Sequence, residues 1–151
     1  MTSTATPVDG RVIGLAHYAG RAVLESVLAR YGITFAQSVA LRLVAAAGHP
    51  VGRPELVGHV TGSLKITGAD ASIAVDGLVG SALLAPHEPS AVRITEAGRA
   101  AQEGITAETG AVSARIYAGI PAVDLAVAGR VLALVTERAD AELAAPADGA
   151  G

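Results

Sequence analysis

Four side chains that can ionise or form hydrogen bonds lie close together near the N-terminus: His17, Tyr18, Arg21 and Glu25. Three of them are spaced by four residues, a step that places side chains on one face of an α-helix. We call this set the N-terminal polar stripe. It could bind a polar ligand or supply general acids and bases. The alternative is a solvated helix face whose Arg–Glu pair stabilises the helix by about 0.2–0.5 kcal/mol.

The other histidines do not suggest a metal site. His49, His59 and His87 are scattered along the chain, whereas zinc requires three or four converging ligands. The sequence also contains no GxSxG, Walker loop, GxGxxG after a strand, or HExxH. We therefore expect no metal, no cofactor and no catalytic residue. A cofactor-free enzyme built on the N-terminal polar stripe stays open, because acid–base groups leave little trace in a sequence.

Composition indicates a globular chain with an aliphatic core. The 151 residues suit one domain or one protomer of an intertwined dimer, and they are 51% hydrophobic and 17% charged. Aromatic residues make up 3% and cysteine is absent, which excludes disulfides and thiolate chemistry. The N-terminus does not resemble a signal peptide, and no uninterrupted apolar run reaches the roughly 18 residues of a membrane span. We expect a cytoplasmic protein with no membrane partner.

Hydrophobic periodicity and capping residues predict mainly α structure. A first helix runs from Arg11 to about Arg30, and a second follows Thr34 and ends at Gly48. A third begins at Pro54-Glu55, and a fourth covers about residues 67–80. A long helix of about 24 residues starts at Thr95, with three internal glycines that suggest compensating packing, for example against a partner subunit. Gly119-Ile120-Pro121 ends it, and a final helix of broad apolar face follows.

Between the terminal helices, residues 55–99 follow a particular order. Two helices, the second ending in VDGLV, precede two strands at about 82–87 and 91–95, with a short proline-containing tip, and TEAGR opens the next helix. This order is that of a winged helix, which places one helix in the DNA major groove and a hairpin beside it. We therefore expect an α+β fold in which a winged helix-turn-helix lobe is flanked by dimerisation helices.

Nearly the whole chain resembles the MarR family of ligand-responsive transcription regulators. The resemblance is carried by YGITFAQSVALRLV, PELVGHV, VDGLVGSALL, VRITEAGRAA and PAVDLAVAGRVLALVTER. It implies a homodimer in which two winged helices bind a pseudo-palindromic operator, with a small-molecule pocket between the dimerisation helices and the DNA-binding lobe. The expected division is a flexible tail at 1–10, N-terminal dimerisation and pocket helices at 11–50, the winged helix-turn-helix at 51–95, C-terminal dimerisation helices at 96–144 and a second tail at 145–151.

The resemblance also implies which residues contact each partner. The expected DNA-binding residues are Lys65, Thr67, Ser72, His87 and Arg93. The expected ligand-binding residues are the N-terminal polar stripe, His17, Tyr18, Arg21 and Glu25, together with Tyr31.

The sequence departs from the family where DNA contact is expected. Ile73 and Gly77 stand where the family often has arginine, Asp70 would face phosphate, and Ala82 replaces a glycine before the wing. Net charge is −3 with a pI near 5.7, whereas DNA-binding domains often exceed pI 9. Between residues 55 and 95 the local charge is 2 − 4 = −2, from two basic residues and four acidic ones.

Three function classes follow. The first is a MarR-like homodimeric transcription regulator that binds duplex DNA and senses a small hydrophobic or phenolic ligand. The second is a MarR-fold protein that has lost DNA binding and acts as a ligand-binding protein or cofactor-free enzyme through the pocket near His17 and Arg21. A third, a protein–protein module that dimerises with a true regulator, is weaker. The fold favours the first class over an enzyme, whereas the charge of the recognition face favours the second.

Overall fold

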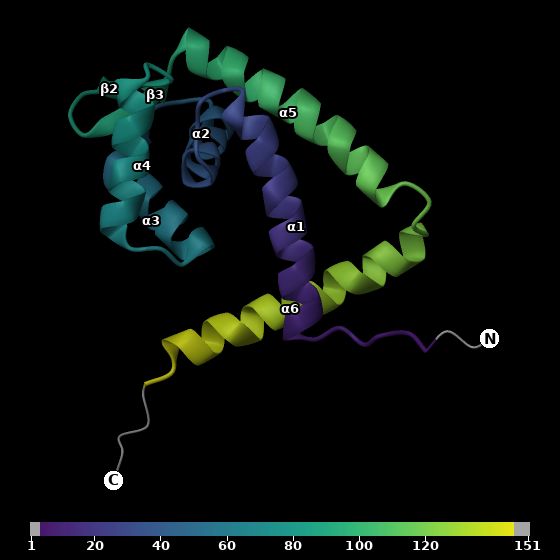
Figure 1. The fold of residues 1–151 in the computed structure, drawn as a ribbon. Coiled ribbons are helices and arrows are strands. Elements are labelled where there is room, and N and C mark those ends of the chain that lie inside the picture. Colours follow the sequence, from purple (N-terminus) through teal and green to yellow (C-terminus); the bar gives the residue numbers. More distant parts are fainter. Residues whose placement is uncertain (1–3, 147–151) are drawn as a thin grey trace. The chain divides into compact units, whose positions relative to one another are not determined.

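The computed structural model describes residues 4–146, which form six α-helices and three β-strands (Figure 1). The mainly helical α+β class is as predicted. The chain forms two compact units that divide between Val112 and Ser113, within the fifth helix. The tails predicted at 1–10 and 145–151 lie partly outside the described residues. The helices are α1 (Gly10–Ala29), α2 (Phe35–Ala47), α3 (Arg53–Leu64), α4 (Gly68–Gly80), α5 (Glu96–Tyr117) and α6 (Ala122–Ala144), and the strands are β1 (Val51–Gly52), β2 (Leu84–His87) and β3 (Ala91–Ile94).

Local capping explains where the first helices begin and end. The Asp9 carboxylate accepts a hydrogen bond from the Val12 amide at 2.8 Å and starts α1. Thr34 and Gln37 form a capping box at the start of α2, and Gly48, with a φ of 69°, ends that helix in the left-handed conformation. These helices therefore lie within one or two residues of their predicted bounds.

The sheet has three strands: both predicted strands are present, and a third, β1, was not predicted. Its order is β1-β3-β2 and both pairings are antiparallel, with Val51 opposite Val92. The missed strand, β1, has only two residues and is recognisable only through its pairing with β3. The hairpin also begins later than predicted, at Leu84, because Ala82 has a φ of 61° and belongs to the turn that follows α4.

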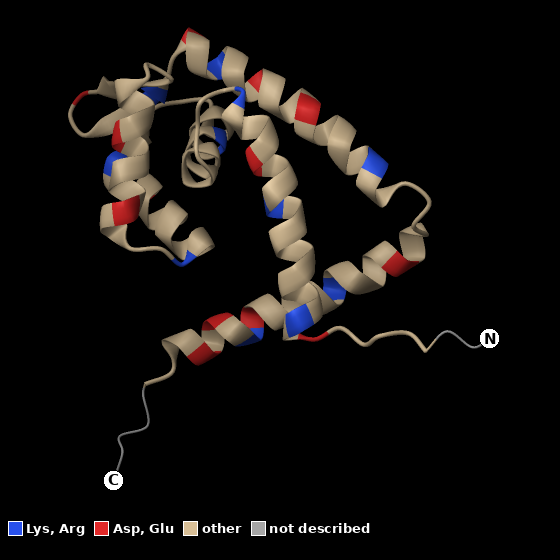
Figure 2. Ribbon diagram, in the orientation of Figure 1, with Lys and Arg blue, Asp and Glu red and all other residues tan. Residues whose placement is uncertain are grey.

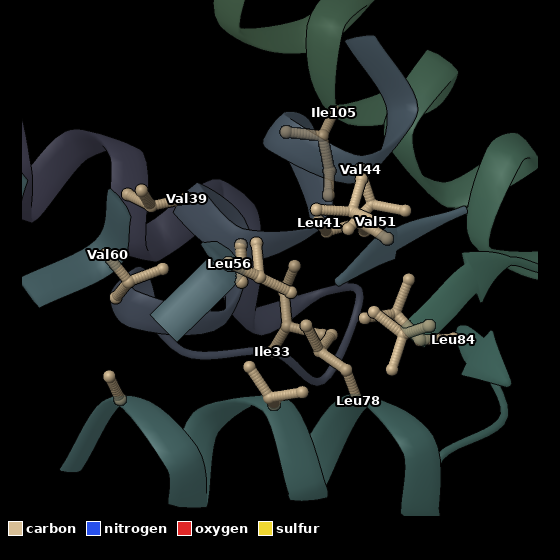
Figure 3. Close-up of a cluster of buried hydrophobic side chains, with 14 of the residues drawn as sticks. Ile33, Val39, Leu41, Val44, Val51, Leu56, Val60, Leu78, Leu84 and Ile105 are labelled. Atoms are coloured by element: carbon tan, nitrogen blue, oxygen red, sulfur yellow. The ribbon is translucent and has the colours of Figure 1, made fainter. Parts of the chain in front are cut away.

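The core of the first unit lies where α2, α3 and α4 pack against one another and against the sheet (Figure 3). Its buried members are all aliphatic, as the low aromatic content predicts. Burying one such leucine stabilises the fold by roughly 1.5–3 kcal/mol. This core fixes the positions of α3, α4 and the hairpin. Its largest fully buried side chains are Leu28, Leu41, Leu56, Leu78 and Leu84.

Two of the three glycines in α5 pack closely against other parts of the first unit, and the expected packing of this helix against a partner subunit stays a prediction. A Cβ at Gly98 would collide with the carbonyl oxygen of Leu83. A Cβ at Gly104 would lie 2.5 Å from the Tyr31 hydroxyl. Only Gly110 among these three has no atom within 4 Å of a Cβ. The glycines therefore let the first part of α5 approach the wing and the end of α1.

Within residues 4–146, one helix is long and apolar enough to cross a membrane: α1, with a mean hydropathy of 1.2. A second stretch meets the same criterion only if α5 and α6 are counted as one span across the break between them. In α1, Arg11, His17, Arg21 and Glu25 interrupt the apolar residues. Leu28, near its end, belongs to the core of the first unit, as in helices of globular proteins. The absence of a membrane partner stays a prediction.

Candidate functional site

The turn between α3 and α4 is set by two of the predicted DNA-binding residues. Lys65 ends α3 with a φ of 57°, and its Nζ donates a hydrogen bond to the Gly62 carbonyl at 2.7 Å. Thr67 starts α4, because its Oγ1 accepts a hydrogen bond from the Asp70 amide at 3.1 Å. Both residues therefore shape the helix-turn-helix in addition to any contact with DNA.

One side of α4 faces the core and the other faces solvent. Ala71, Val75 and Leu78 are fully buried. We call the opposite side the outward face of α4, and Ile73 lies on it with 66% of its surface exposed. A helix that enters the major groove would present this face to the base edges. The outward face consists of Ala69, Asp70, Ile73, Asp76 and Gly80.

Ser72 borders the outward face and is held by Arg53, a residue that the sequence analysis missed. The Nη2 of Arg53 donates to the Ser72 carbonyl at 3.2 Å and to the Ser72 Oγ at 3.1 Å. The same nitrogen forms an ion pair with the Asp76 carboxylate. Arg53 precedes residues 55–95, the segment whose net charge is −2. Its position, directly before Pro54 at the start of a predicted helix, was the signal that could have identified it.

The wing brings the other two predicted DNA-binding residues to one surface. Ala85 is opposite Arg93 and His87 is opposite Ala91 in the β2–β3 ladder, so His87 and Arg93 lie on the same face of the hairpin. Both are exposed, whereas Leu84 and Val92, on the other face, are buried. The wing therefore offers one guanidinium and one imidazole to solvent.

A pocket of about 340 Å³ opens in the first unit between α1, the start of α2 and the α3–α4 turn. Its volume lies within the usual range for small-molecule sites, about 300–1,000 Å³. The Arg21 guanidinium lies 4.5 Å from the centre of the Phe35 ring, and its Nε donates to Glu25 at 2.9 Å. The lining residues are His17, Arg21, Phe35, Ala36, Ser63, Leu64 and Ile66.

The predicted ligand residues do not all reach this pocket. His17 and Arg21 line it, and Glu25 is linked to it through its bond to Arg21. Tyr18 is 70% exposed and is not in the lining, although its ring centre lies 5.7 Å from that of His17. Tyr31 lies elsewhere, at the end of α1, where it contacts α5.

The sequence matches no protein-family model and no curated protein, but the fold is similar to solved structures. Reduced MarR from E. coli is 20% identical with a TM-score of 0.68, covering 87% of this chain and 95% of that chain. Rv2887, a MarR family protein of Mycobacterium tuberculosis in complex with DNA, is 20% identical with a TM-score of 0.63, covering 87% of this chain and 98% of that chain. CouR from Rhodococcus jostii RHA1, bound to p-coumaroyl-CoA, is 19% identical with a TM-score of 0.70, covering 86% of this chain and 93% of that chain.

The chain has the fold of the MarR family. In this MarR fold, α3, α4 and the β2–β3 hairpin form the winged helix-turn-helix lobe that the sequence analysis predicted. The lobe carries little positive charge, as Figure 2 shows for α4 and the hairpin. Residues 53–95 hold three basic and four acidic side chains, so their net charge is 3 − 4 = −1. The basic residues are Arg53, Lys65 and Arg93, and the acidic ones are Glu55, Asp70, Asp76 and Glu88.

A second polar cluster of this chain joins the residues that follow α1, Arg30 and Tyr31, to α5. The Tyr31 hydroxyl donates to Glu108 at 2.5 Å, and the Arg30 guanidinium donates to the other oxygen of Glu108 at 2.5 Å. Hydrogen bonding from Tyr31, and then from Arg30, lowers the pKa of Glu108. The hydrogen bond to Glu108 and the desolvation of the phenol raise the pKa of Tyr31. Sequence spacing could not reveal this cluster, because Tyr31 and Glu108 are 77 residues apart.

Among residues 4–146, no three His, Cys, Asp or Glu side chains lie close enough together to hold a metal ion. His49 bonds the Pro50 carbonyl, and the His59 imidazole lies 3.9 Å from the Glu55 carboxylate. His87 is exposed at the end of β2. The expectation that the MarR fold of this chain binds no metal stays a prediction.

Proposed function

We propose that this chain is a homodimeric, cytoplasmic, DNA-binding transcription regulator of the MarR type that responds to a small-molecule ligand. The observation that carries the proposal is the position of the pocket. Three of its lining residues lie just before α4: Ser63 and Leu64 end α3, and Ile66 belongs to the turn between α3 and α4. The pocket is therefore lined by the turn that leads into the candidate recognition helix.

Contact between a ligand and this turn supplies a route from ligand to DNA. Ile66 is adjacent to Thr67, the residue whose hydroxyl caps the start of α4. A ligand that contacts Ile66 and Leu64 favours the turn conformation that fits it. Ligand binding then changes operator affinity by as much as the ligand's affinities for the two conformations differ.

The pocket chemistry suits a small aromatic acid or phenol. Arg21 provides positive charge, His17 and Ser63 provide hydrogen bonds, and Phe35 and Ile66 provide apolar surface. Because Glu25 already accepts a bond from Arg21, a ligand carboxylate would share or replace that contact. CouR, which has the same fold, is bound to p-coumaroyl-CoA, an aromatic acyl thioester.

The ligand assignment is tested by calorimetry with benzoate and 4-hydroxybenzoate. We expect at least one of them to bind the purified protein, and Arg21→Gln to weaken that binding by tenfold or more, about 1.4 kcal/mol. Arg11→Gln, which removes the same charge from α1 outside the pocket, is the matched control. Equal losses in the two variants would exclude Arg21 as a ligand contact.

On the DNA side, we assign contacts to Lys65, Thr67, Ser72, His87 and Arg93, the residues that the resemblance implies. In addition to basic side chains, serine and threonine hydroxyls, backbone amides and helix N-termini make contacts with phosphate in protein–DNA complexes. This set offers two full positive charges, so we expect weak non-specific binding and a shallow dependence on salt.

DNA binding is tested with a pool of random duplex DNA. Fluorescence anisotropy measures the affinity while the salt concentration is raised from low to physiological. The proposal is supported if the logarithm of the binding constant falls linearly with the logarithm of the salt concentration, because each neutralised phosphate contributes about −0.9 to that slope. An operator can then be selected from the same pool. No binding at any salt concentration would exclude a DNA-binding regulator in the unliganded state.

The composition of the outward face of α4 favours one alternative. This helix has no Lys or Arg, and its outward face carries two carboxylates. A MarR-fold protein that has lost DNA binding, and that binds or converts a small molecule in the pocket near His17 and Arg21, is therefore the second candidate. Ligand binding without DNA binding in the two experiments above would establish it in place of the first.

A further inference from the structure

The contact between Arg53 and Asp76 joins the beginning of α3 to the outward face of α4. The Asp76 side chain is 65% exposed, whereas the Arg53 side chain is 32% exposed. Arg53 also bonds the Ser72 hydroxyl and carbonyl, so its guanidinium is held against α4 by three acceptors. A basic residue of the winged-helix lobe is thereby paired with an acidic residue of the same lobe.

The location of Asp76 makes this pair relevant to DNA. Asp76 lies on the outward face of α4, on the opposite side of the helix from Ala71, Val75 and Leu78. If α4 enters the major groove, the Asp76 carboxylate approaches the base edges between two rows of phosphates. An anion at this place weakens binding to any sequence unless it finds a hydrogen-bond donor there.

The major groove provides such a donor at cytosine. In protein–DNA complexes an aspartate carboxylate accepts a hydrogen bond from the N4 amino group of this base. When Asp76 turns to that donor, it no longer neutralises Arg53. The guanidinium is then available to a backbone phosphate, which matters because phosphate contacts supply most of the non-specific affinity. Exchange of partners would thus occur on some sequences and not on others.

We propose that Asp76 is a specificity-determining residue that pairs with Arg53 in the free protein and with a cytosine amino group in the operator complex. Arg53 then binds phosphate only where a cytosine lies beneath Asp76. The pair lowers affinity for random DNA more than affinity for the operator, and so it increases the ratio between them. This inference rests on the proposed DNA-binding function.

The test compares the wild-type protein with Asp76→Asn, Arg53→Gln and the double variant, on random duplex DNA and on an operator selected with the wild-type protein. Asp76→Asn should strengthen random-duplex binding roughly tenfold at 0.1 M salt and steepen the salt slope by about one. It should also abolish the preference for cytosine at one position of each half-site. Asp70→Asn, which removes the same charge from the same face, is the control.

The double variant separates release of Arg53 from simple loss of a negative charge. In the Arg53→Gln background, Asp76→Asn should give no more gain than Asp70→Asn gives. An equal gain with and without Arg53, an unchanged random-duplex affinity, or a retained cytosine preference in Asp76→Asn would overturn the inference while leaving the regulator proposal intact. Failure of the wild-type protein and of Asp76→Asn to bind any duplex would overturn both. Circular dichroism confirms that each variant is folded.

Discussion

At the scale of single residues, Ala82 has an unfavourable backbone conformation. Its φ of 61° lies in the left-handed region, which costs a residue with a Cβ about 1–2 kcal/mol. The conformation is maintained because the Ala82 amide donates to Val79 at 3.0 Å and its carbonyl accepts from the Thr95 hydroxyl at 2.6 Å. The turn between α4 and the wing therefore depends on its neighbours for stability.

We expect Ala82→Gly to stabilise the protein by about 0.5–1 kcal/mol. Relief of the left-handed strain outweighs the greater entropy of glycine in the unfolded chain. The change is measured as a shift of the urea midpoint at constant slope. Ala85→Gly, at a strand position of β2, is the control and should destabilise the protein. A loss of stability in Ala82→Gly would show that the turn stores no strain.

Glu108 predicts how stability depends on acid. Because its pKa is lower in the folded chain than the ordinary value of 4.5, its ionised form stabilises the fold. That contribution is complete above pH 4.5 and is lost as the pH falls through the lowered folded pKa. Glu108→Gln should therefore destabilise the protein at pH 7 and lose less further stability than the wild type on acidification to pH 3.

Urea midpoints at pH 7 and pH 3, at one protein concentration, measure this difference. Glu103→Gln, at an exposed position of the same helix, is the control for removal of a carboxylate. If the acid dependence of Glu108→Gln equals that of the wild type, the bonds from Tyr31 and Arg30 do not stabilise ionised Glu108.

At the scale of elements, the junction between the wing and α5 depends on Gly98. A Cβ there would meet the backbone of Leu83, which cannot move without displacing β2. We expect Gly98→Ala to destabilise the protein by about 1–3 kcal/mol, as overpacking usually does. The control is Gly58→Ala in α3, where no atom lies within 4 Å of a Cβ. That variant should gain up to about 1 kcal/mol of helix stability.

Thermal unfolding of the two alanine variants tests the contrast. Equal midpoints would mean that α5 can move away from Leu83 at little cost. The close approach at Gly98 would then not be what positions the wing.

The same elements show how far sequence reasoning extends. Helix α2 could be predicted almost to the residue, because Thr34, Gln37 and Gly48 cap it through local contacts. Strand β1 could not, because a two-residue strand exists only through its pairing with β3. Local signals define helices well, whereas pairing across the chain is a property of the fold.

The candidate site divides in the same way. The four-residue spacing of His17 and Arg21 correctly predicted that they share a surface, and both line the pocket. The contribution of Ser63 and Ile66 could not be predicted, because it requires α1 and the α3–α4 turn to pack around one cavity. Arg53 was missed for a related reason: its partner Asp76 is 23 residues away on another helix.

At the scale of the whole molecule, α6 carries an apolar stripe that is not buried among the described residues 4–146. None of its 23 residues is buried, and Val127, Val131 and Leu134 recur on one side with roughly two-fifths to half of each exposed. Soluble monomers rarely leave so continuous an apolar stripe in water. In the proposed homodimer, a second copy of the chain covers this apolar stripe. Two copies also present two winged-helix lobes to the half-sites of one operator.

We expect sedimentation equilibrium to give a mass of about twice the 14.9 kDa of one chain. Leu134→Glu should shift this mass toward that of one chain, because a charge in an apolar interface remains unpaired after desolvation. Thr136→Glu introduces the same charge on the other side of α6 and should leave the dimer intact. Operator affinity should fall together with dimerisation in Leu134→Glu and not in Thr136→Glu, since the two lobes are then no longer linked and each binds its half-site independently. A wild-type monomer would contradict the proposed homodimer, and equal behaviour of the two variants would exclude this stripe as the interface.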